Sequence, residues 1–242
     1  RHGGGAEQGC RQERLESCSR SVGIRGWWTD GSSRRAAGTE SAQGAEAGRS
    51  DGILIVLRDT MLCMDIPNFT NPEKNIDLLG VYEGMQVADL GAGIGAYTVP
   101  LAHRVGEKGR VYAVAVQKEF LSNIKAAVSA QNLSNVELLW GDIERYGGTK
   151  IKEGSLDAVI VSNVLFQAED KQGLIREAHR ILKTGGKMLL VDWKESFKGL
   201  GPARDAVVSV ATARTLCETG GFVVKKEFDA GEHHYGFIMF KS

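Results

Sequence analysis

The sequence predicts an α/β fold: a doubly wound, mostly parallel seven-stranded sheet with an antiparallel C-terminal hairpin strand. Short apolar runs alternate with segments that carry apolar residues at helical spacing, from about residue 71 to residue 241. The apolar runs lack polar alternation, which is typical of strands covered on both faces. The last two runs are joined by a short turn, and therefore form a hairpin.

Each element follows from a local pattern. The predicted strands are 86–90, 110–116, 136–140, 156–161, 187–192, 222–228 and 235–240. Asn71-Pro72-Glu73 begins a first helix, which Gly80 ends. Further helices are predicted at 95–105, 119–131, 171–183 and 202–219. Glycine pairs after the last two helices provide their stops.

Composition excludes several classes of protein. The 242 residues suit one domain, or one domain plus an appendage. Thirty basic and thirty acidic residues leave no net charge, so nothing global favours nucleic acid or an anionic membrane. The longest aliphatic run spans residues 53–57, far short of the roughly 20 residues that cross a bilayer. We expect no membrane insertion.

The cysteines do not indicate a metal site. The four are Cys10, Cys18, Cys63 and Cys217, with no CxxC pair and no histidine at zinc-ligand spacing. We expect free thiols in a reducing compartment, which predicts a cytoplasmic protein that holds no metal.

The chain divides into two kinds of sequence. Residues 1–52 contain only Leu15, Val22 and Ile24 from the Leu/Ile/Val/Phe set, too few to offset the entropy of ordering. We predict that residues 1–63 are a disordered or mis-annotated extension and that 64–242 form the domain. Two explanations stay open: a gene model extended upstream of Met61 or Met64, which we favour, and a genuine flexible tail.

A glycine-rich turn joins the first predicted strand to the next helix. Gly91, Gly93 and Gly95 lack side chains, so the backbone can turn tightly and approach a ligand. Ligands of open parallel sheets bind at the carboxyl ends of the strands, where this turn lies. The turn therefore predicts a nucleoside cofactor. Gly91, Gly93 and Ala96 also satisfy the dinucleotide fingerprint, and a turn with no ligand is a further alternative.

Several blocks in order carry a family resemblance. Val-Ala-Asp-Leu-Gly-Ala-Gly-Ile-Gly-Ala-Tyr-Thr at 87–98 resembles the first motif of class I S-adenosylmethionine-dependent methyltransferases, in particular type-11 and ubiquinone/menaquinone-biosynthesis C-methyltransferases. Further similar blocks lie at 109–114, 135–143, 156–163 and 177–192. The C-terminal hairpin also matches, whereas a nicotinamide-binding domain lacks it. The resemblance implies a Rossmann-like methyltransferase fold and S-adenosylmethionine as the cofactor.

The resemblance assigns roles at the first strand. Gly91 and Gly93, with Gly95 in the same turn, would pass close to the methionine part of the cofactor. Asp89 would anchor the loop and reach toward the cofactor's amino group, directly or through water.

It also assigns roles after the third and fourth strands. Asp142 would accept a hydrogen bond from the adenine amino group, and Ile143 would pack on the ring. Ser162 and Asn163 would line the floor near the methyl group. Asp142 as the cap of a following helix, and Asn163 as an ordinary turn residue, are the alternatives.

One position departs from the family. The second strand normally ends in an acidic residue that accepts both ribose hydroxyls, but this chain has Ala115 there. Losing hydrogen bonds to a charged acceptor weakens binding by about 1.5–3 kcal/mol each at most. The departure supports an alternative function, a degenerate methyltransferase-fold domain that binds cofactor weakly or serves protein interaction.

Methyl transfer requires little of the protein. The enzyme orients the acceptor and excludes water, and a general base is needed only for a protonated acceptor. We therefore name no catalytic residue. His233-His234 offers a base, but adjacent hairpin residues point to opposite faces and a plain turn is favoured. We expect a small-molecule acceptor, with nucleic acid or protein substrates not excluded.

Overall fold

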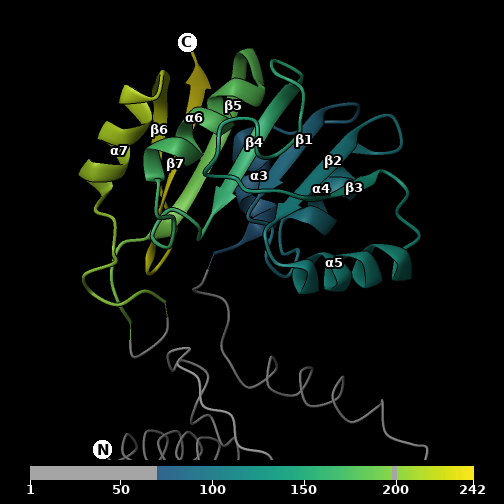
Figure 1. Cartoon of the computed structure of the whole chain (residues 1–242), viewed down its shortest axis with the longest axis horizontal. Coiled ribbons are helices and arrows are strands. Elements are labelled where there is room, and N and C mark those ends of the chain that lie inside the picture. The colour runs from purple at the N-terminus through teal and green to yellow at the C-terminus, as the bar shows by residue number, and fades with distance from the viewer. Residues whose placement is uncertain (1–69, 198–200) are drawn as a thin grey trace, which may run out of the picture. The chain divides into compact units, whose positions relative to one another are not determined.

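The computed structural model describes residues 70–197 and 201–242, whose arrangement Figure 1 shows. This part contains a seven-stranded sheet in the order β3-β2-β1-β4-β5-β7-β6. β7 runs antiparallel to both neighbours, and the remaining neighbours are parallel. The strands are β1 Gln86–Leu90, β2 Arg110–Ala115, β3 Val136–Trp140, β4 Leu156–Ser162, β5 Leu182–Trp193, β6 Phe222–Gly231 and β7 His234–Lys241. The predicted fold class is confirmed.

Helices cover both faces of the sheet. They are α3 Pro72–Leu79, α4 Thr98–Val105, α5 Lys118–Ala130, α6 Lys171–Ile181 and α7 Val210–Thr219. Apolar side chains of α3, α4 and α5 pack on one face, and those of α6 and α7 pack on the other. The sheet is thus doubly wound, and its strand order reverses between β1 and β4, where open sheets bind ligands.

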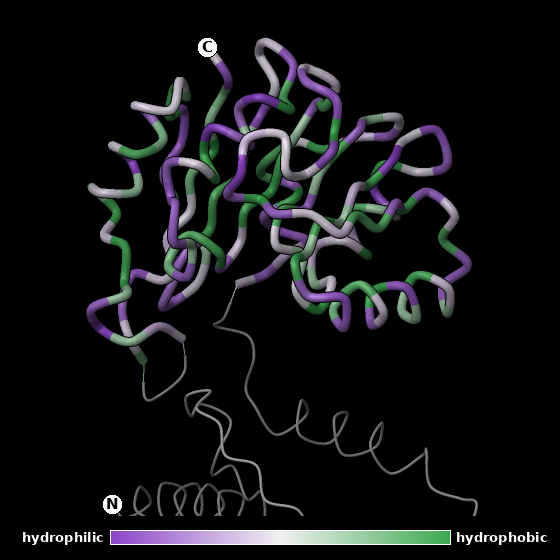
Figure 2. Tube along the Cα trace, viewed as in Figure 1, coloured by the Kyte–Doolittle hydropathy of each residue, from purple (hydrophilic) through white to green (hydrophobic). Residues whose placement is uncertain are grey.

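The central strands are almost wholly buried. Every residue of β1 after Gln86 is buried, as are most of β4 and the second half of β5. Figure 2 shows the hydrophobic residues concentrated along these strands, with hydrophilic residues on the outer loops and helices. This burial on both faces explains why the strand sequences lack polar alternation.

Three helix predictions were wrong by two or more residues at one end. The helix predicted at 95–105 begins at Thr98, because Gly95 has a φ of +85° outside the helical region. The helix predicted at 171–183 ends at Ile181, because Leu182 turns to extended geometry and pairs with Leu156.

The largest error concerns the helix predicted at 202–219. It begins only at Val210, where the Ser209 side chain accepts a hydrogen bond from the backbone N–H of Thr212. The cap fixes the start of the helix, and residues 202–209 run as irregular chain instead.

The predictions about membrane insertion and about the cysteines can be compared with the structure only within the described residues. No helix among residues 70–197 and 201–242 is long and apolar enough to cross a membrane. Cys217, the cysteine within this part, is a buried free thiol. The proposed boundary between 1–63 and 64–242, and the other three cysteines, lie outside the described residues.

Candidate cofactor site

The glycine turn lies at the carboxyl edge of the sheet, between β1 and α4. The backbone N–H groups of Gly91 and Ala92 both donate to the carbonyl oxygen of Val114 in β2, at 3.0 and 3.1 Å. Gly91, Gly93 and Gly95 all have positive φ, of +73°, +50° and +85°. Because side chains disfavour this conformation, the backbone shape itself requires the three glycines.

The three glycines differ in what surrounds them. A Cβ on Gly91 would lie 2.5 Å from a methyl of Val164, and one on Gly95 would lie 3.0 Å from Ile124. A Cβ on Gly93 would meet nothing closer than the Gly91 carbonyl oxygen at 3.8 Å. Gly91 and Gly95 therefore permit close packing, whereas Gly93 borders open space.

Asp89 fixes the turn from inside the sheet. Its side chain is 2 % exposed and accepts a hydrogen bond from the Thr98 hydroxyl at 2.6 Å, which ties β1 to the first residue of α4. Burial raises the pKa of Asp89 to about 6, although the hydrogen bonds from Thr98 oppose this shift. Asp89 therefore anchors the start of α4 to β1, and its contact with the cofactor's amino group stays a prediction.

Tyr97 is a member of the site to which the sequence assigned no role. Its buried hydroxyl accepts a hydrogen bond from the amide of Asn75 in α3 at 2.8 Å, and the side chains of Ser162 and Thr70 also interact with it. Burial raises the pKa of Tyr97. The signal was present in the Gly-Ala-Tyr-Thr sequence, but only the fold brings α3 and β4 to this hydroxyl.

The loop after β3 presents Asp142 at the surface and Ile143 inside. Asp142 is exposed and accepts a hydrogen bond from the backbone N–H of Glu144 at 3.0 Å. This is a turn and no helix follows directly, so the helix-cap alternative was wrong. Ile143 is 5 % exposed and lies beside Gly91 in the core, so it supports the glycine turn. Its adenine contact stays a prediction.

Asn163 follows the last residue of β4. It has a left-handed φ of 57°, and its backbone N–H donates to the Val191 carbonyl oxygen at 2.9 Å. Asn tolerates this conformation, which agrees with the turn-residue alternative. Its amide oxygen is also buried without a hydrogen-bond partner among the described residues. Buried acceptors are rarely left unpaired, so this oxygen is compatible with a donor from a ligand, and the contact of Asn163 with the cofactor stays a prediction.

A second buried carboxylate holds the loop that contains Asn163. Asp192, near the end of β5, accepts hydrogen bonds from the backbone N–H groups of Trp193 at 2.7 Å and Phe166 at 3.0 Å. Burial raises the pKa of Asp192 to about 6. The loop after β4 is therefore fixed by β5.

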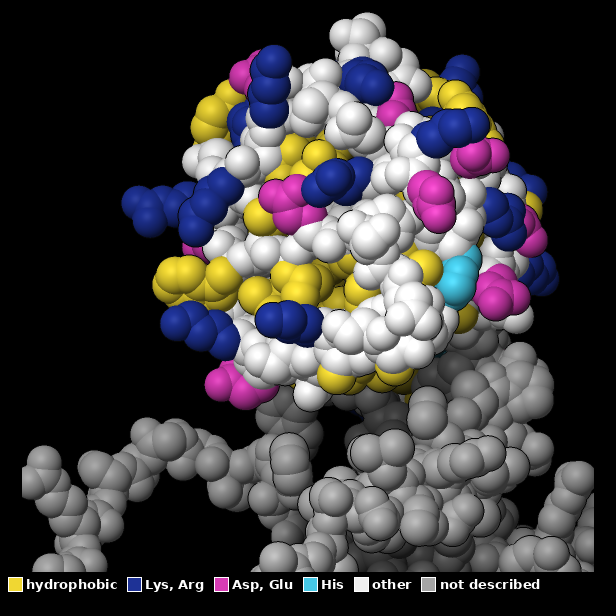
Figure 3. All heavy atoms as spheres, turned by 90° about the vertical axis from the view of Figure 1, so that its right-hand side faces the viewer, with side chains coloured by type: hydrophobic (Ala, Val, Ile, Leu, Met, Phe, Trp, Pro, Cys, Tyr) yellow, Lys and Arg dark blue, Asp and Glu magenta, His cyan; other side chains and the backbone are white. Residues whose placement is uncertain are grey.

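The end of β2 has no acid for the ribose. Ala115 is its last residue, 3 % exposed, and pairs with Trp140 of β3. The Trp140 indole N–H donates to the Val116 carbonyl oxygen at 2.8 Å, while the ammonium of Lys118 lies 4.9 Å from the Trp140 ring. Figure 3 shows this side of the domain, where apolar side chains lie among basic ones.

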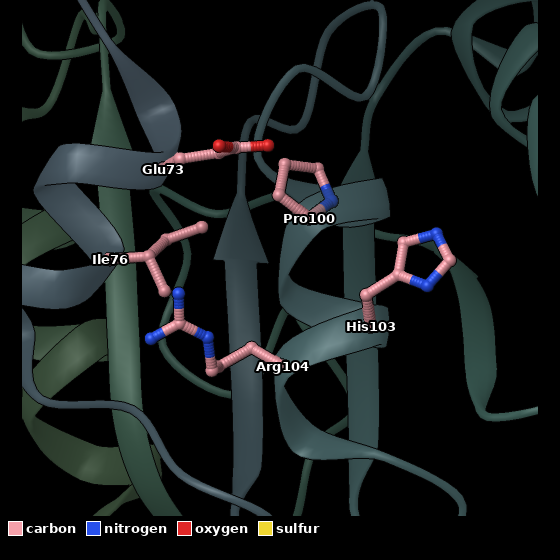
Figure 4. A pocket seen from close by; sticks show the side chains of 5 residues that line it. All are labelled: Glu73, Ile76, Pro100, His103 and Arg104. Atoms are coloured by element: carbon pink, nitrogen blue, oxygen red, sulfur yellow. The ribbon is translucent and has the colours of Figure 1, made fainter.

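Two other features lie apart from the glycine turn. His233 and His234 lie at the β6–β7 turn, where His233 is 2.7 Å from a Glu195 carboxylate oxygen. A cavity of about 380 Å³ opens between α3 and α4 and is lined by Glu73, Ile76, Pro100, His103 and Arg104, as Figure 4 shows. None of these residues was predicted to bind the cofactor.

The described residues fit an adenosyl sulfonium ligand. Gly93 leaves room beside the turn, and the orphaned oxygen of Asn163 lacks a donor. The carboxylates of Asp89 and Asp142 are the acceptors that amino groups need. Such a site in a 3-2-1-4-5-7-6 sheet defines a class I methyltransferase domain.

Comparisons with known proteins identify the domain more closely. Residues 88–190 match the family model described as methyltransferase domain. The structure resembles a SAM-dependent methyltransferase from Aquifex aeolicus, with a TM-score of 0.67 and 26% identity, covering 77% of this chain and 98% of that chain. The chain therefore contains a class I S-adenosylmethionine-dependent methyltransferase domain, as the resemblance predicted.

Curated relatives agree on the class but differ in acceptor. An arsenite methyltransferase from Aquipseudomonas alcaligenes is 33% identical over 114 residues, 46% of this chain and 33% of that protein. A ubiquinone/menaquinone biosynthesis C-methyltransferase from Cronobacter sakazakii is 28% identical over 165 residues, 66% of this chain and 61% of that protein. The chain thus spans less than two thirds of the length of both relatives.

Proposed function

We propose that the protein transfers a methyl group from S-adenosylmethionine to a small-molecule acceptor. The observation that carries the proposal is the glycine turn at the strand-order switch, with room beside Gly93 and buried acceptors at Asp89 and Asn163. The bound cofactor supplies a methyl group already activated on a sulfonium. What the protein adds is binding, orientation and exclusion of water.

The charges of the site support this assignment. Asp89 accepts the Thr98 hydroxyl through one oxygen, and in the proposal its second oxygen faces the cofactor's amino group. Asp142 uses Oδ1 for its own turn, and its other oxygen accepts from the adenine amino group in the proposal. In the proposal the Asp89 carboxylate complements the positive ammonium group, and Asp142 supplies a hydrogen-bond acceptor for the neutral adenine.

Residues at the end of β4 border the methyl group in the proposal. Ser162 interacts with the Tyr97 hydroxyl, and Asn163 presents its amide oxygen. These residues would orient the acceptor toward the activated methyl group that the cofactor would supply, so alignment dominates the rate. No residue is assigned as a base, because an acceptor without a proton to lose needs none.

The names of the relatives support a small acceptor, since one acts on arsenite and another belongs to quinone biosynthesis. Soft centres such as trivalent arsenic favour thiolate ligands. Within the described residues the thiol is Cys217, and burial raises its pKa to about 12, so it stays protonated inside the core. This favours an acceptor that needs no cysteine ligand from the described residues.

Calorimetric titration of the 242-residue chain with S-adenosylmethionine, S-adenosylhomocysteine and NADH tests the proposal. We expect micromolar binding of both adenosyl ligands and none of NADH. Gly93→Leu should abolish binding of both adenosyl ligands, because the leucine side chain fills the open space beside the turn.

Gly154→Leu is the matched control. Gly154 also has positive φ, of +59°, and open surroundings, but it lies at the opposite edge of the sheet before β4. It carries the same backbone strain and should leave binding unchanged. A folded wild-type chain that binds neither adenosyl ligand at millimolar concentration would instead support the degenerate-domain alternative.

A further inference from the structure

A buried ion pair on α6 lies next to the loop after β3. The carboxylate of Glu177 is fully buried, and its two oxygens each accept a hydrogen bond at 2.8 Å from the Arg180 guanidinium. Arg180 also donates to the Ile151 carbonyl oxygen at 2.8 Å. The pair is thus bidentate and shielded from water, which makes it geometrically rigid.

The same carboxylate holds the loop. The backbone N–H groups of Gly147 and Thr149 donate to Glu177 at 2.7 and 3.2 Å, and the Thr149 hydroxyl donates at 2.5 Å. Glu177 therefore accepts five hydrogen bonds, three of them from a segment that ends seven residues after Asp142.

This segment lies directly against the backbone of Asp142. A Cβ on Gly148 would lie 2.2 Å from the Asp142 carbonyl oxygen, and a Cβ on Gly141 would lie 2.5 Å from the Gly148 carbonyl oxygen. The loop folds back so closely that its return limb, the part bonded to Glu177, determines where Asp142 lies.

The outgoing limb is attached to the same helix. The Glu144 side chain accepts a hydrogen bond from the backbone N–H of Asp170, the N-cap of α6, at 2.6 Å. Gly173 leaves no space for a side chain against the Glu144 carbonyl oxygen. Both limbs of the loop are therefore fixed to α6, and Asp142 lies two residues before the first of these attachments.

We propose that Glu177 is a positioning residue for cofactor binding, which acts by holding the Asp142 loop in its binding geometry. The inference rests on the proposed function, because it requires Asp142 to bind the adenosyl ligand. Glu177 does not touch the ligand itself. Its role is separate from that of the glycine turn, which β1 and β2 fix.

The Glu177→Gln variant tests this role. All five groups bonded to Glu177 are hydrogen-bond donors. A glutamine amide has one acceptor oxygen, and its NH2 group would face donors from which it cannot accept. We expect the Kd for S-adenosylmethionine and S-adenosylhomocysteine to rise about tenfold, as for loss of a hydrogen bond to a charged group.

The decisive readout is a double-mutant cycle with Asp142→Ala, measured by calorimetry on the full chain. If Glu177 acts through Asp142, Glu177→Gln will weaken binding little further in the Asp142→Ala background. Ile181→Val is the control, because it removes a buried methyl from the same helix without removing any of the hydrogen bonds between Glu177 and the loop, and it should leave the Kd unchanged.

Other outcomes contradict the proposal. Equal losses in both backgrounds, an unchanged Kd in folded Glu177→Gln, or a matching loss in Ile181→Val would overturn it. If Glu177→Gln does not fold, Thr149→Val, which removes one donor and keeps the carboxylate, decides by the same cycle. A wild-type chain that binds no adenosyl ligand overturns the proposed function as well, so the two failures are distinguishable.

Discussion

Two loops at the carboxyl edge of the sheet are each held by a buried carboxylate, but the carboxylates differ in what compensates their charge. Glu177 holds the loop after β3 and has the Arg180 guanidinium 2.8 Å away. Asp192 holds the loop after β4 through backbone N–H groups, with Lys171 contributing only at longer range.

The pKa values follow from this difference. Burial raises the pKa of Glu177, but hydrogen bonds from Arg180 and Thr149 more than offset it, so it lies below the usual value. For Asp192 burial prevails, and the pKa rises to about 6. A paired carboxylate therefore stays charged near neutrality, whereas an unpaired one holds its loop at a cost in stability that depends on pH.

The largest expected effect comes from removing the cation of the paired site. Arg180→Met should lower the free energy of unfolding by about 3–5 kcal/mol, because it leaves the buried charge of Glu177 without a counterion. Chemical denaturation at pH 7 measures it. Arg214→Met removes an exposed arginine from its ion pairs with Glu218 and Glu227 and should change stability little. Equal effects of the two substitutions would contradict the comparison.

A smaller effect should appear in the pH dependence of stability. The folded pKa of Asp192 is about 6 and the unfolded value is 3.8, so the folded state binds more protons between these values. The free energy of unfolding must then fall as pH rises from about 4 to 6, by at most about 3 kcal/mol from this group.

Asp192→Asn should remove this part of the fall, since asparagine does not titrate. Denaturation curves of both proteins at pH 4, 5, 6 and 7 give the slopes, which are independent of the lost hydrogen bond. Identical slopes would show that Asp192 titrates normally.

Asp89 is a third buried carboxylate, and its charge should affect cofactor binding rather than stability. Its pKa of about 6 in the free protein means that an ammonium ligand binds best above pH 6, where the carboxylate is charged. We expect the Kd for S-adenosylmethionine to rise about tenfold from pH 7 to pH 5. The pKa lies midway between these two pH values, so the charged fraction of Asp89 falls about tenfold over this range. Asp89→Asn should weaken binding at pH 7 and flatten this dependence. Asp77→Asn, on the exposed face of α3, is the control.

The smallest expected effect is a gain. Ala115→Asp restores an acid at the end of β2, and we expect about fivefold tighter binding of S-adenosylhomocysteine, limited by the cost of burying the charge. Gln117→Asp adds the same charge two residues further along and should not tighten binding. A gain with Gln117→Asp alone would show that the ribose lies nearer to α5 than the family pattern implies.

Local patterns predicted most of the fold. The bounds of β1 and β3 were predicted without error, because buried strands are short apolar runs between turn residues. The start of α7 was missed because residues 202–209 have a composition compatible with a helix, and the Ser209 cap decides otherwise. The end of α6 was missed because the pairing of Leu182 with Leu156 is a long-range contact.

The sequence predicted the glycine turn of the candidate site, but it did not predict the side chains that hold the neighbouring loops in place. The glycine turn was readable because positive φ demands glycine at Gly91, Gly93 and Gly95. Asp142 was identified by family resemblance, but Glu177 appeared only as part of a similar block. No local pattern reveals that a carboxylate on a helix accepts hydrogen bonds from a loop nearly 30 residues earlier.

The sequence by itself therefore determined the fold class, because periodicity, turn residues and glycine positions are local, and its resemblance to a known family indicated the class of protein. Only the tertiary structure decided which groups hold the site in place. The Tyr97 hydroxyl joins α3 to β4, Asp192 holds the loop after β4, and Glu177 holds the loop after β3. These contacts join segments far apart in sequence, and burial sets the charge of each group only once the sheet and its helices have closed around it.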